Sequence, residues 1–234
     1  MNNIRRKINK RALFLSQHFF YRVFYQWVRH IFDADVLHLN VHVKKLDKPV
    51  IIIANHISAW DPFLIFSILN RKFILRNLVW RLPAAPNQFT SLYQRIFFKL
   101  IGVYKIESKG NLSKSLEETF DIIDSGSNTM FFPEGKLVGS AENTKPKKGV
   151  SYIIEKRDVY ILPIFLYYHK RNLNGKGIRF GKARAVVGDL IESKYFLDNY
   201  DCNSRHQAVM SHIYKLEKHL KDRFGEEAVT PIFK

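Results

Sequence analysis

The feature that most constrains the fold is an apolar run at residues 49–54 that leads directly into a polar turn. The run reads Pro-Val-Ile-Ile-Ile-Ala, and residues 55–62 then read Asn-His-Ile-Ser-Ala-Trp-Asp-Pro. Consecutive Val and Ile residues are typical of a strand that is covered on both faces, as strands of parallel sheets are. The polar residues therefore follow the carboxyl end of a buried strand, where binding groups collect in open α/β sheets.

Other segments of the chain alternate between strand and helix patterns. Further strands are predicted at 36–43, 72–76, 103–107, 129–133, 159–167 and 178–188. Between them, Ser115 and Glu118 predict a capping box for a helix that ends at Gly126. A last helix is predicted from Asn203 or Ser204 to Gly225. We therefore expect an α/β fold, a mixed central sheet flanked by helices.

The first 32 residues contain seven Lys or Arg residues and no acid. At 100° per residue, one side of a helix would carry Arg11, His18, Arg22 and Arg29. The opposite side would carry Leu13, Phe20, Phe24, Trp27 and Ile31. This pattern predicts an amphipathic helix that lies in a membrane surface, although an apolar face that covers the domain core fits it too. We expect residues 1–32 to form a membrane-associating segment and residues 33–234 to form the catalytic domain.

Charge and cysteine content limit the partners of the chain. A net charge of +17 over 234 residues attracts polyanions such as nucleic acid, anionic lipid or phosphorylated substrates. The single cysteine, Cys202, excludes an internal disulfide and a CxxC metal or redox site. We expect no segment of about 20 apolar residues to span a bilayer. A non-catalytic nucleic-acid-binding protein stays an alternative, but we find no recognition motif for it.

The polar turn contains a histidine and an aspartate five positions apart, His56 and Asp61. A hydroxyl is a poor nucleophile at neutral pH, and a histidine base within hydrogen-bond reach can take its proton. An adjacent carboxylate would fix the tautomer of the imidazole and stabilise the imidazolium that forms. Asp61 could instead cap the helix that Pro62 begins, and His56 could be a turn residue bonded to the backbone.

Four blocks of the sequence together resemble the glycerolipid acyltransferases typified by bacterial 1-acylglycerol-3-phosphate acyltransferase. The first is the His-x4-Asp core within residues 55–61, and the second is Gly102 with the strand that follows. The third is Phe-Pro-Glu-Gly at residues 132–135, and the fourth is the proline-containing strand at residues 161–164. The resemblance covers roughly residues 36–190. Two arginines of the family pattern are replaced, by Ser108 and Leu137.

The resemblance implies roles for particular residues. His56 would be the general base and Asp61 its partner, while Glu134 and Gly135 would shape the acceptor pocket. Family members place a cation on the strand after the first block, and we expect Arg76 to be that cation. Where the two arginines are lost, the cations available for a phosphate are Arg76, with Lys105, Lys109 and Lys136 as possible substitutes.

The expected function is transfer of a fatty acyl group from acyl-CoA or acyl carrier protein to a lysophospholipid hydroxyl. The expected acceptor is 1-acyl-sn-glycerol-3-phosphate, in phospholipid biosynthesis; a different lysolipid or lipid-linked hydroxyl is the alternative. Because the thioester is already activated, this chemistry needs no metal and no redox cofactor. The expected partners are the two substrates and anionic lipids, with the protein peripheral or monotopic on the cytoplasmic face of a membrane.

Overall fold

The computed structural model describes residues 10–40, 45–77, 79–107, 110–137, 145–168 and 182–225. These residues contain an eight-stranded sheet with the order β1-β7-β6-β2-β5-β3-β4, and β8 pairs with β6. Strands β6, β2, β5, β3 and β4 run parallel to one another, whereas β7 and β8 are antiparallel to β6. The expected mixed sheet is therefore confirmed. The strand bounds are β1 Asp35–His38, β2 Val50–Ala54, β3 Trp80–Ala84, β4 Val103–Lys105, β5 Asn128–Phe131, β6 Tyr160–Tyr168, β7 Ala183–Val187 and β8 Ile191–Glu192.

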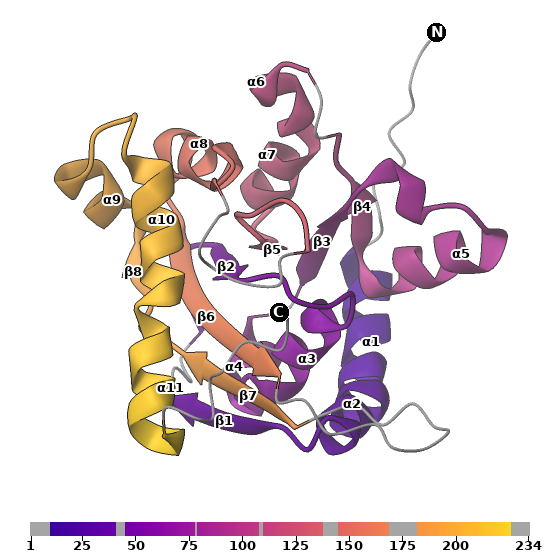
Figure 1. Ribbon diagram of the computed structural model, residues 1–234. Coiled ribbons are helices and arrows are strands. Elements are labelled where there is room, and N and C mark those ends of the chain that lie inside the picture. Colours follow the sequence, from indigo (N-terminus) through magenta and orange to yellow (C-terminus); the bar gives the residue numbers. More distant parts are fainter. Residues whose placement is uncertain are drawn as a thin grey trace, which may run out of the picture.

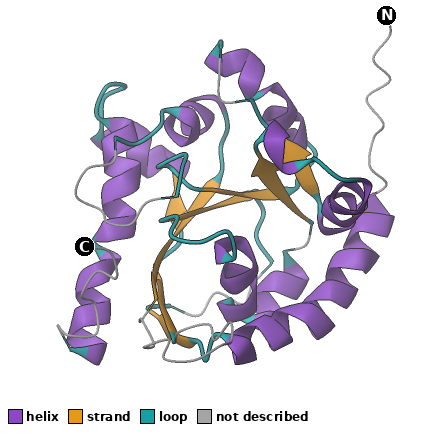
Figure 2. Ribbon diagram, turned by 45° about the vertical axis from the view of Figure 1, so that its right-hand side comes forward, coloured by secondary structure: helices purple, strands orange, loops and turns teal. Residues whose placement is uncertain are grey.

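Helices cover both faces of the sheet (Figures 1 and 2). Strand β2 is fully buried because its side chains alternate between two apolar clusters. Ile52 faces the cluster that the N-terminal helices complete, and Ile51 faces the cluster under the C-terminal helices. Burial on both faces explains why the sequence of this strand is an unbroken apolar run.

The first face is covered by α1 Lys10–Phe20, the π-helix η1 Tyr21–Tyr25, α2 Gln26–Ile31, α3 Asp61–Ile68 and α4 Arg71–Arg76. The second face is covered by α7 Glu117–Asp124, α8 Gly149–Lys156, α9 Ser193–Asn199, α10 Arg205–Tyr214 and α11 Leu216–Phe224. The predicted last helix is thus a pair, α10 and α11. Its predicted inner side is buried in the second cluster, namely Val209, Ile213, Leu216 and Leu220.

Two elements lie at the edge formed by β3 and β4, the 3₁₀ turn η2 Pro86–Gln88 and helix α5 Leu92–Ile101, whereas the short helix α6 Leu112–Ser115 packs next to α7. Helix α5 begins with a capping box made by Ser91 and Gln94. It ends at Gly102, whose φ of 87° is left-handed. A Cβ at Gly102 would come within 2.6 Å of the Trp80 carbonyl oxygen, so only glycine fits between α5 and β4.

The N-terminal helix is joined to the domain core. Four residues of its inner side, or just after it, belong to the first cluster: Tyr21, Tyr25, Val28 and Phe32. The buried side chain of Gln17 accepts a hydrogen bond from Trp80 N at 3.0 Å and donates to the Ile101 carbonyl at 3.0 Å. One side of the helix thus covers the core. The division at residue 32 stays a prediction, and residues 1–9 lie outside the described residues.

Two sequence predictions about local structure are wrong. Residues 72–76, predicted as a strand, lie in helix α4, because the Asn70 side chain caps that helix by accepting from the N–H groups of Lys72 and Phe73. The capping box of Ser115 and Glu118 does not form, because Ser115 ends α6 and α7 begins at Glu117.

Several predicted strands are longer than the strands observed. Strand β1 ends at His38 and β4 ends at Lys105. Within the predicted strands at 36–43 and 178–188, residues 41–43 and 178–181 lie outside the described residues. Among the residues that are described, no helix has both the length and the apolar character needed to cross a bilayer.

Candidate active site

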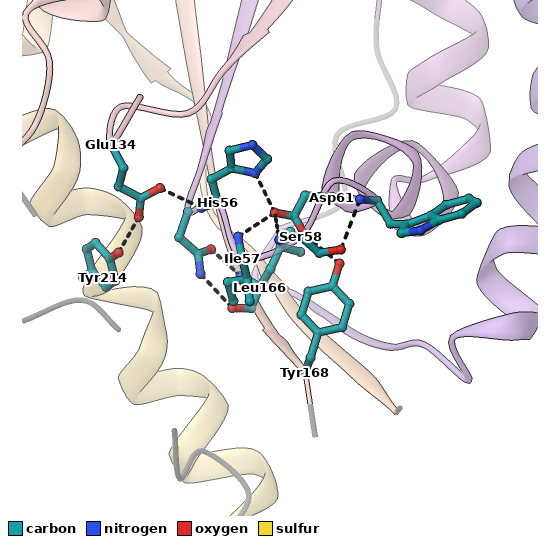
Figure 3. Close-up of polar contacts among 10 residues, drawn as sticks. His56, Ile57, Ser58, Asp61, Glu134, Leu166, Tyr168 and Tyr214 are labelled. Atoms are coloured by element: carbon teal, nitrogen blue, oxygen red, sulfur yellow. Dashed lines mark hydrogen bonds and ion pairs between the residues drawn. The ribbon is translucent and has the colours of Figure 1, made fainter. Parts of the chain in front are cut away.

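The His-x4-Asp turn lies directly after the carboxyl end of β2, and it is held there by its first residue, Asn55. The Asn55 side chain donates to the Leu166 carbonyl at 2.8 Å and accepts from Leu166 N at 2.7 Å. These two hydrogen bonds join the end of β2 to the carboxyl-terminal part of β6. His56 and Asp61 then face each other, with 2.8 Å between His56 Nδ1 and Asp61 Oδ2 (Figure 3).

Asp61 is fully buried and its two carboxylate oxygens receive different donors. Oδ2 accepts from His56 Nδ1 and from the backbone N–H groups of Ile57 at 2.7 Å and Ser58 at 2.8 Å. Oδ1 accepts from the Tyr168 hydroxyl at 2.6 Å. Burial and the adjacent carboxylate raise the pKa of Tyr168 well above its ordinary value, so this hydroxyl stays a donor.

These contacts distinguish between the two interpretations of Asp61. The backbone donors of Asp61 lie in the loop before α3, whereas a capping residue accepts from the N–H groups of the helix itself. Trp60, not Asp61, occupies the N-cap position of α3. Asp61 is therefore placed to orient the His56 ring and the loop that carries it.

Glu134 supports His56 from the other side of the site. Glu134 Oε2 accepts from His56 N at 2.6 Å, and Oε1 accepts from the Tyr214 hydroxyl of α10 at 2.5 Å (Figure 3). Burial raises the pKa of Glu134, and the two hydrogen bonds oppose that rise by stabilising the carboxylate. The predicted pocket-shaping residue thus holds the backbone of the predicted base.

The His56 ring is both fixed and accessible. It stacks on Phe132 with ring centroids 4.0 Å apart and planes 13° from parallel. Its side chain keeps 21% of its surface exposed, while that of Asp61 keeps none. Nε2 receives no hydrogen bond from the described part of the chain, which leaves it available to a substrate hydroxyl. A ring with Nδ1 on a carboxylate and Nε2 available can act as a general base.

Arg76, the predicted strand cation, lies away from this site. It is the last residue of α4, and the next residue, Asn77, has its carbonyl bonded to the Asn128 side chain. Asn128 in turn accepts from Val50 N at 2.7 Å. These contacts are at the amino ends of β2 and β5, whereas His56 follows the carboxyl end of β2. The structure therefore does not bring Arg76 together with His56.

The strand that does follow the first motif is β3, and its cation is Arg81, which sequence reasoning missed. Arg81 donates to the Gly102 carbonyl at 2.9 Å and lies 3.6 Å from Glu118. Its guanidinium also stacks over the Tyr104 ring. Arg81 pairs in register with Thr129, which pairs with Ile51, so it is level with the start of β2. Because the sequence predicts residues 72–76 as the strand that follows the first motif, it assigns the cation of that strand to Arg76 instead of Arg81.

The other predicted cations lie in different surroundings. Lys105 is exposed at the end of β4, with Nζ 5.1 Å from the centre of the Phe89 ring. Lys136 is exposed in the turn that follows Glu134. Ser108, at one lost arginine, and the candidate cation Lys109 lie outside the described residues, and Leu137, at the other lost arginine, is 55% exposed.

A second lysine, Lys147, lies against the Glu134 turn and was not predicted as a site residue. Lys147 N donates to the Pro133 carbonyl at 2.7 Å. Gly135 has a φ of 67°, and a Cβ there would come within 2.9 Å of Lys147 Cγ. The basic run at residues 145–148 was the available sequence signal. The turn that bonds His56 thus has two exposed lysines beside Glu134, Lys136 on the turn itself and Lys147 packed against it.

Fold and site together define an α/β protein with a histidine–aspartate pair at the carboxyl end of a central parallel strand. Comparison with known proteins identifies the family: the family described as Acyltransferase matches residues 36–167. The chain belongs to this family. The match includes the His-x4-Asp turn, the Glu134 turn and almost all of β6.

Two relatives can be named. Over 169 residues, 70% of the chain, the sequence is 26% identical to a 1-acyl-sn-glycerol-3-phosphate acyltransferase of Chlamydomonas reinhardtii. The chain spans about half the length of that relative, 48%. The crystal structure of the 1-acyl-sn-glycerophosphate acyltransferase of Thermotoga maritima has a similar fold, with a TM-score of 0.60 and 17% identity. That similarity covers 92% of this chain and 97% of the other.

Proposed function

We propose that the protein is an O-acyltransferase that moves a fatty acyl group from a thioester to the hydroxyl of a lysophospholipid. The observation that carries this proposal is the His56–Asp61 pair, with Nδ1 on a buried carboxylate and Nε2 unbonded among the described residues. Membership of the acyltransferase family supports the reaction class. The geometry supports the use of His56 as base rather than as a structural residue.

The proposed reaction begins when His56 Nε2 removes the proton from the acceptor hydroxyl as its oxygen attacks the thioester carbonyl carbon. The C–O bond forms and the C–S bond breaks, which yields an ester and a thiol after the proton passes from His56 to the leaving sulfur. Asp61 holds the Nδ1–H and stabilises the transient imidazolium. General-base assistance of this kind contributes about 10²–10⁴ in rate. The residues supply this chemistry by themselves, and we propose no resident cofactor.

For the acceptor we propose 1-acyl-sn-glycerol-3-phosphate, in phospholipid biosynthesis. The printed name of the Chlamydomonas relative supports this acceptor. In this chain, Lys136 lies on the turn whose Glu134 bonds His56 N, and Lys147 packs against that turn, so two cations lie near the proposed base and are candidates to bind a phosphate. The structure argues against Arg76 as a ligand for that phosphate because of its place at the far end of β2.

A second acceptor class is favoured by one observation. Leu137 stands where the family pattern has an arginine and is exposed, so a bidentate guanidinium clamp is lost from the Glu134 turn. A lysolipid with a larger or zwitterionic headgroup does not require that clamp. The acyl donor is proposed to be acyl-CoA or acyl carrier protein, since both present a thioester and negative charge to a chain of +17.

We further propose that the protein works at the cytoplasmic face of a membrane that contains anionic lipids, as a peripheral or monotopic protein. Two observations support this: the first 32 residues contain no acid, and large apolar side chains are exposed on the N-terminal helix. We propose no nucleic-acid partner.

The purified protein should transfer radiolabelled acyl groups from acyl-CoA or acyl carrier protein to a lysolipid, measured by thin-layer chromatography over an acceptor panel. His56→Ala should abolish transfer while the thermal unfolding midpoint stays near that of the wild type. Transfer that persists in His56→Ala would contradict the proposed base. An active wild type that ignores every lysolipid would contradict the acceptor class.

Variants of Lys136 and Lys147 test which of the two acceptor classes the protein uses. A charge-assisted hydrogen bond is worth about 1.5–3 kcal/mol, so Lys136→Ala and Lys147→Ala should each raise the KM for lysophosphatidate about tenfold or more. Lys194→Ala on α9 is the matched control, since Lys194 is exposed on another helix. An unchanged KM in both variants, with faster turnover of a zwitterionic lysolipid by the wild type, would favour the second acceptor class.

A further inference from the structure

Helix α5 displays several large apolar side chains on the protein surface. Its sequence, LYQRIFFKLI, contains seven apolar residues in ten. Four of them stand out from the protein surface: Tyr93 is 85% exposed, Leu92 69%, Ile96 51% and Leu100 44%. Their spacing of one, three and four residues places them on one side of the helix. A monomeric domain in water has no structural reason to display such a stripe.

A second exposed apolar stripe lies on the N-terminal helix. It consists of residues spaced four apart, and at least half of each side chain is exposed: Leu15, Phe19, Val23 and Trp27. Apart from Trp27, these are not the apolar residues that the 100° pattern predicted. The predicted residues Phe20, Phe24 and Ile31 are partly buried against the core instead. The helix therefore has two apolar sides, one for the core and one exposed.

The two stripes belong to neighbouring helices. The Phe20 ring contacts the Phe97 ring of α5 with centroids 5.7 Å apart. The Ser16 hydroxyl donates to the Leu100 carbonyl at 2.7 Å. Figure 1 shows α5 beside α1 at the same edge of the molecule. We call the eight exposed side chains of the two stripes the α1/α5 surface: Leu15, Phe19, Val23, Trp27, Leu92, Tyr93, Ile96 and Leu100.

The α1/α5 surface is connected to the candidate active site through α3. Phe63 lies two residues after Asp61, and its ring contacts Phe24 of η1 at 5.5 Å and Phe97 of α5 at 6.3 Å between centroids. Trp60 continues this packing with its ring 5.7 Å from that of Phe63. The start of α3 thus touches both the dyad and the helices that display the apolar stripes.

Charge distinguishes between a bilayer and a second copy of the chain as the occupant of this surface. Exposed cations lie on the same helices: Arg11, Arg22 and Arg29 on the N-terminal helix, and Arg95 and Lys99 on α5. A two-fold dimer through this surface would bring like charges together, in a chain of net charge +17. Apolar side chains flanked by cations instead match a bilayer with anionic headgroups.

We propose that α5 is a second membrane-inserting helix, and that it enters an anionic bilayer side by side with the N-terminal helix. The inference rests on the membrane association proposed above and names the surface responsible for it. Insertion of both helices holds α3, and with it His56 and Asp61, next to the headgroup layer. An acceptor could then reach the base without leaving the membrane surface.

Site-specific fluorescence tests whether α5 enters the bilayer. In Cys202→Ser with Ile96→Cys, an environment-sensitive fluorophore at position 96 should shift to the blue when vesicles of phosphatidylglycerol and phosphatidylcholine are added. The matched control is the same fluorophore on the native Cys202, which is exposed and precedes α10. Figure 1 shows α10 and α5 on opposite sides of the molecule. The fluorophore on Cys202 should not shift. A protein that sediments with vesicles while position 96 stays in water would overturn the proposal.

Binding by variants tests the contribution of α5. The triple variant Leu92→Ser, Tyr93→Ser, Ile96→Ser changes exposed side chains and should lower the vesicle partition coefficient more than about tenfold. Leu197→Ser on α9, also an exposed leucine, should leave it unchanged. Equal partitioning of the triple variant and the wild type would overturn the proposal. A concentration-dependent dimer that hides position 96 without vesicles would identify a second copy as the occupant.

The same variant separates this inference from the proposed function. If both hold, the triple variant loses acyl transfer to acceptors in vesicles far more than to a short-chain acceptor in monomeric solution. A wild type that inserts α5 but transfers no acyl group in either form refutes the proposed function alone. A wild type that transfers acyl groups without inserting α5 refutes this inference alone.

Discussion

Replacing Asp61 with asparagine removes one charge from a network whose geometry the amide can retain. Three N–H donors converge on Oδ2, and the fourth donor, the Tyr168 hydroxyl, meets Oδ1. The substituted amide is therefore expected to place its oxygen on the three N–H donors and its NH2 towards Tyr168, whose hydroxyl can rotate to accept. The opposite orientation would oppose donors to donors and is disfavoured.

The expected loss of activity follows from the charge alone. Between charge centres about 4 Å apart, the attraction is about 4 kcal/mol at an effective dielectric constant of about 20. The wild-type carboxylate applies this attraction to the imidazolium that forms during transfer, with Nδ1 and Oδ2 2.8 Å apart. One decade in rate corresponds to about 1.4 kcal/mol, so kcat should fall about 10³-fold. The loop and the His56 tautomer should be retained.

The assay is steady-state acyl transfer together with urea unfolding of each variant. Asp61→Asn should lose about three decades in kcat, with little change in KM and a free energy of unfolding near that of the wild type. Asp124→Asn, which removes an exposed carboxylate paired with Arg157, is the control and should keep full activity. If Asp61→Asn folds normally and keeps more than about a tenth of the wild-type kcat, His56 does not act as a base supported by Asp61.

Three further predictions concern the residues around the dyad and the N-terminal helix. Tyr168→Phe leaves one oxygen of a buried carboxylate without its partner, so unfolding by urea should show a loss of about 1–3 kcal/mol and kcat should fall with KM unchanged. Because the pKa of Glu134 is raised, wild-type stability should fall relative to Glu134→Gln as pH rises from about 4.5 through that pKa, measured by urea titrations across the window. Reversal of charge at Arg11, Arg22 and Arg29 should weaken sedimentation with anionic vesicles, each being worth about 1 kcal/mol, and unchanged sedimentation would exclude an electrostatic role.

The sequence was sufficient to predict β2 and the dyad because both are local. Four consecutive β-branched residues at 50–53, directly before a polar turn, favour a buried strand, and the structure buries each of them completely. His56 and Asp61 lie within one turn of chain, so their meeting requires only that the turn closes. The resemblance to the acyltransferases rested on the same local blocks, and it is confirmed by the family match over residues 36–167.

The error at residues 72–76 arose from a short apolar run that fits two structures. Phe73, Ile74 and Leu75 satisfy a strand as well as one turn of helix, and periodicity cannot distinguish them over so few residues. The decisive residue is Asn70, whose side chain caps the helix. Once the run is helical, the strand moves to Trp80–Ala84, and the cation on it becomes Arg81 instead of Arg76.

The apolar side that the 100° projection identifies on the N-terminal helix is mostly the side that covers the core, and the exposed stripe departs from it already at Leu15 and Phe19, before the pitch of the helix changes. Residues Tyr21–Tyr25 form a π-helix, in which each turn contains more residues than the 3.6 of an α-helix. A projection at 100° per residue therefore loses its phase after Phe20. Because Tyr21, Tyr25, Val28 and Phe32 belong to the core, membrane binding by the N-terminal helix is better tested by substituting its exposed side chains than by deleting it.

Supporting residues of the site could not be predicted, because each comes from a distant segment with no pattern of its own. Tyr168 reaches Asp61 from the end of β6, and Tyr214 reaches Glu134 from α10, 107 and 80 positions along the chain. Their hydroxyls matter because a buried carboxylate needs a donor for each oxygen. Any fold that buries these two acids beside a histidine must supply such donors from elsewhere, so the identity of the donors depends on the complete fold. The base can thus be found from local sequence, whereas what holds it in place requires the structure.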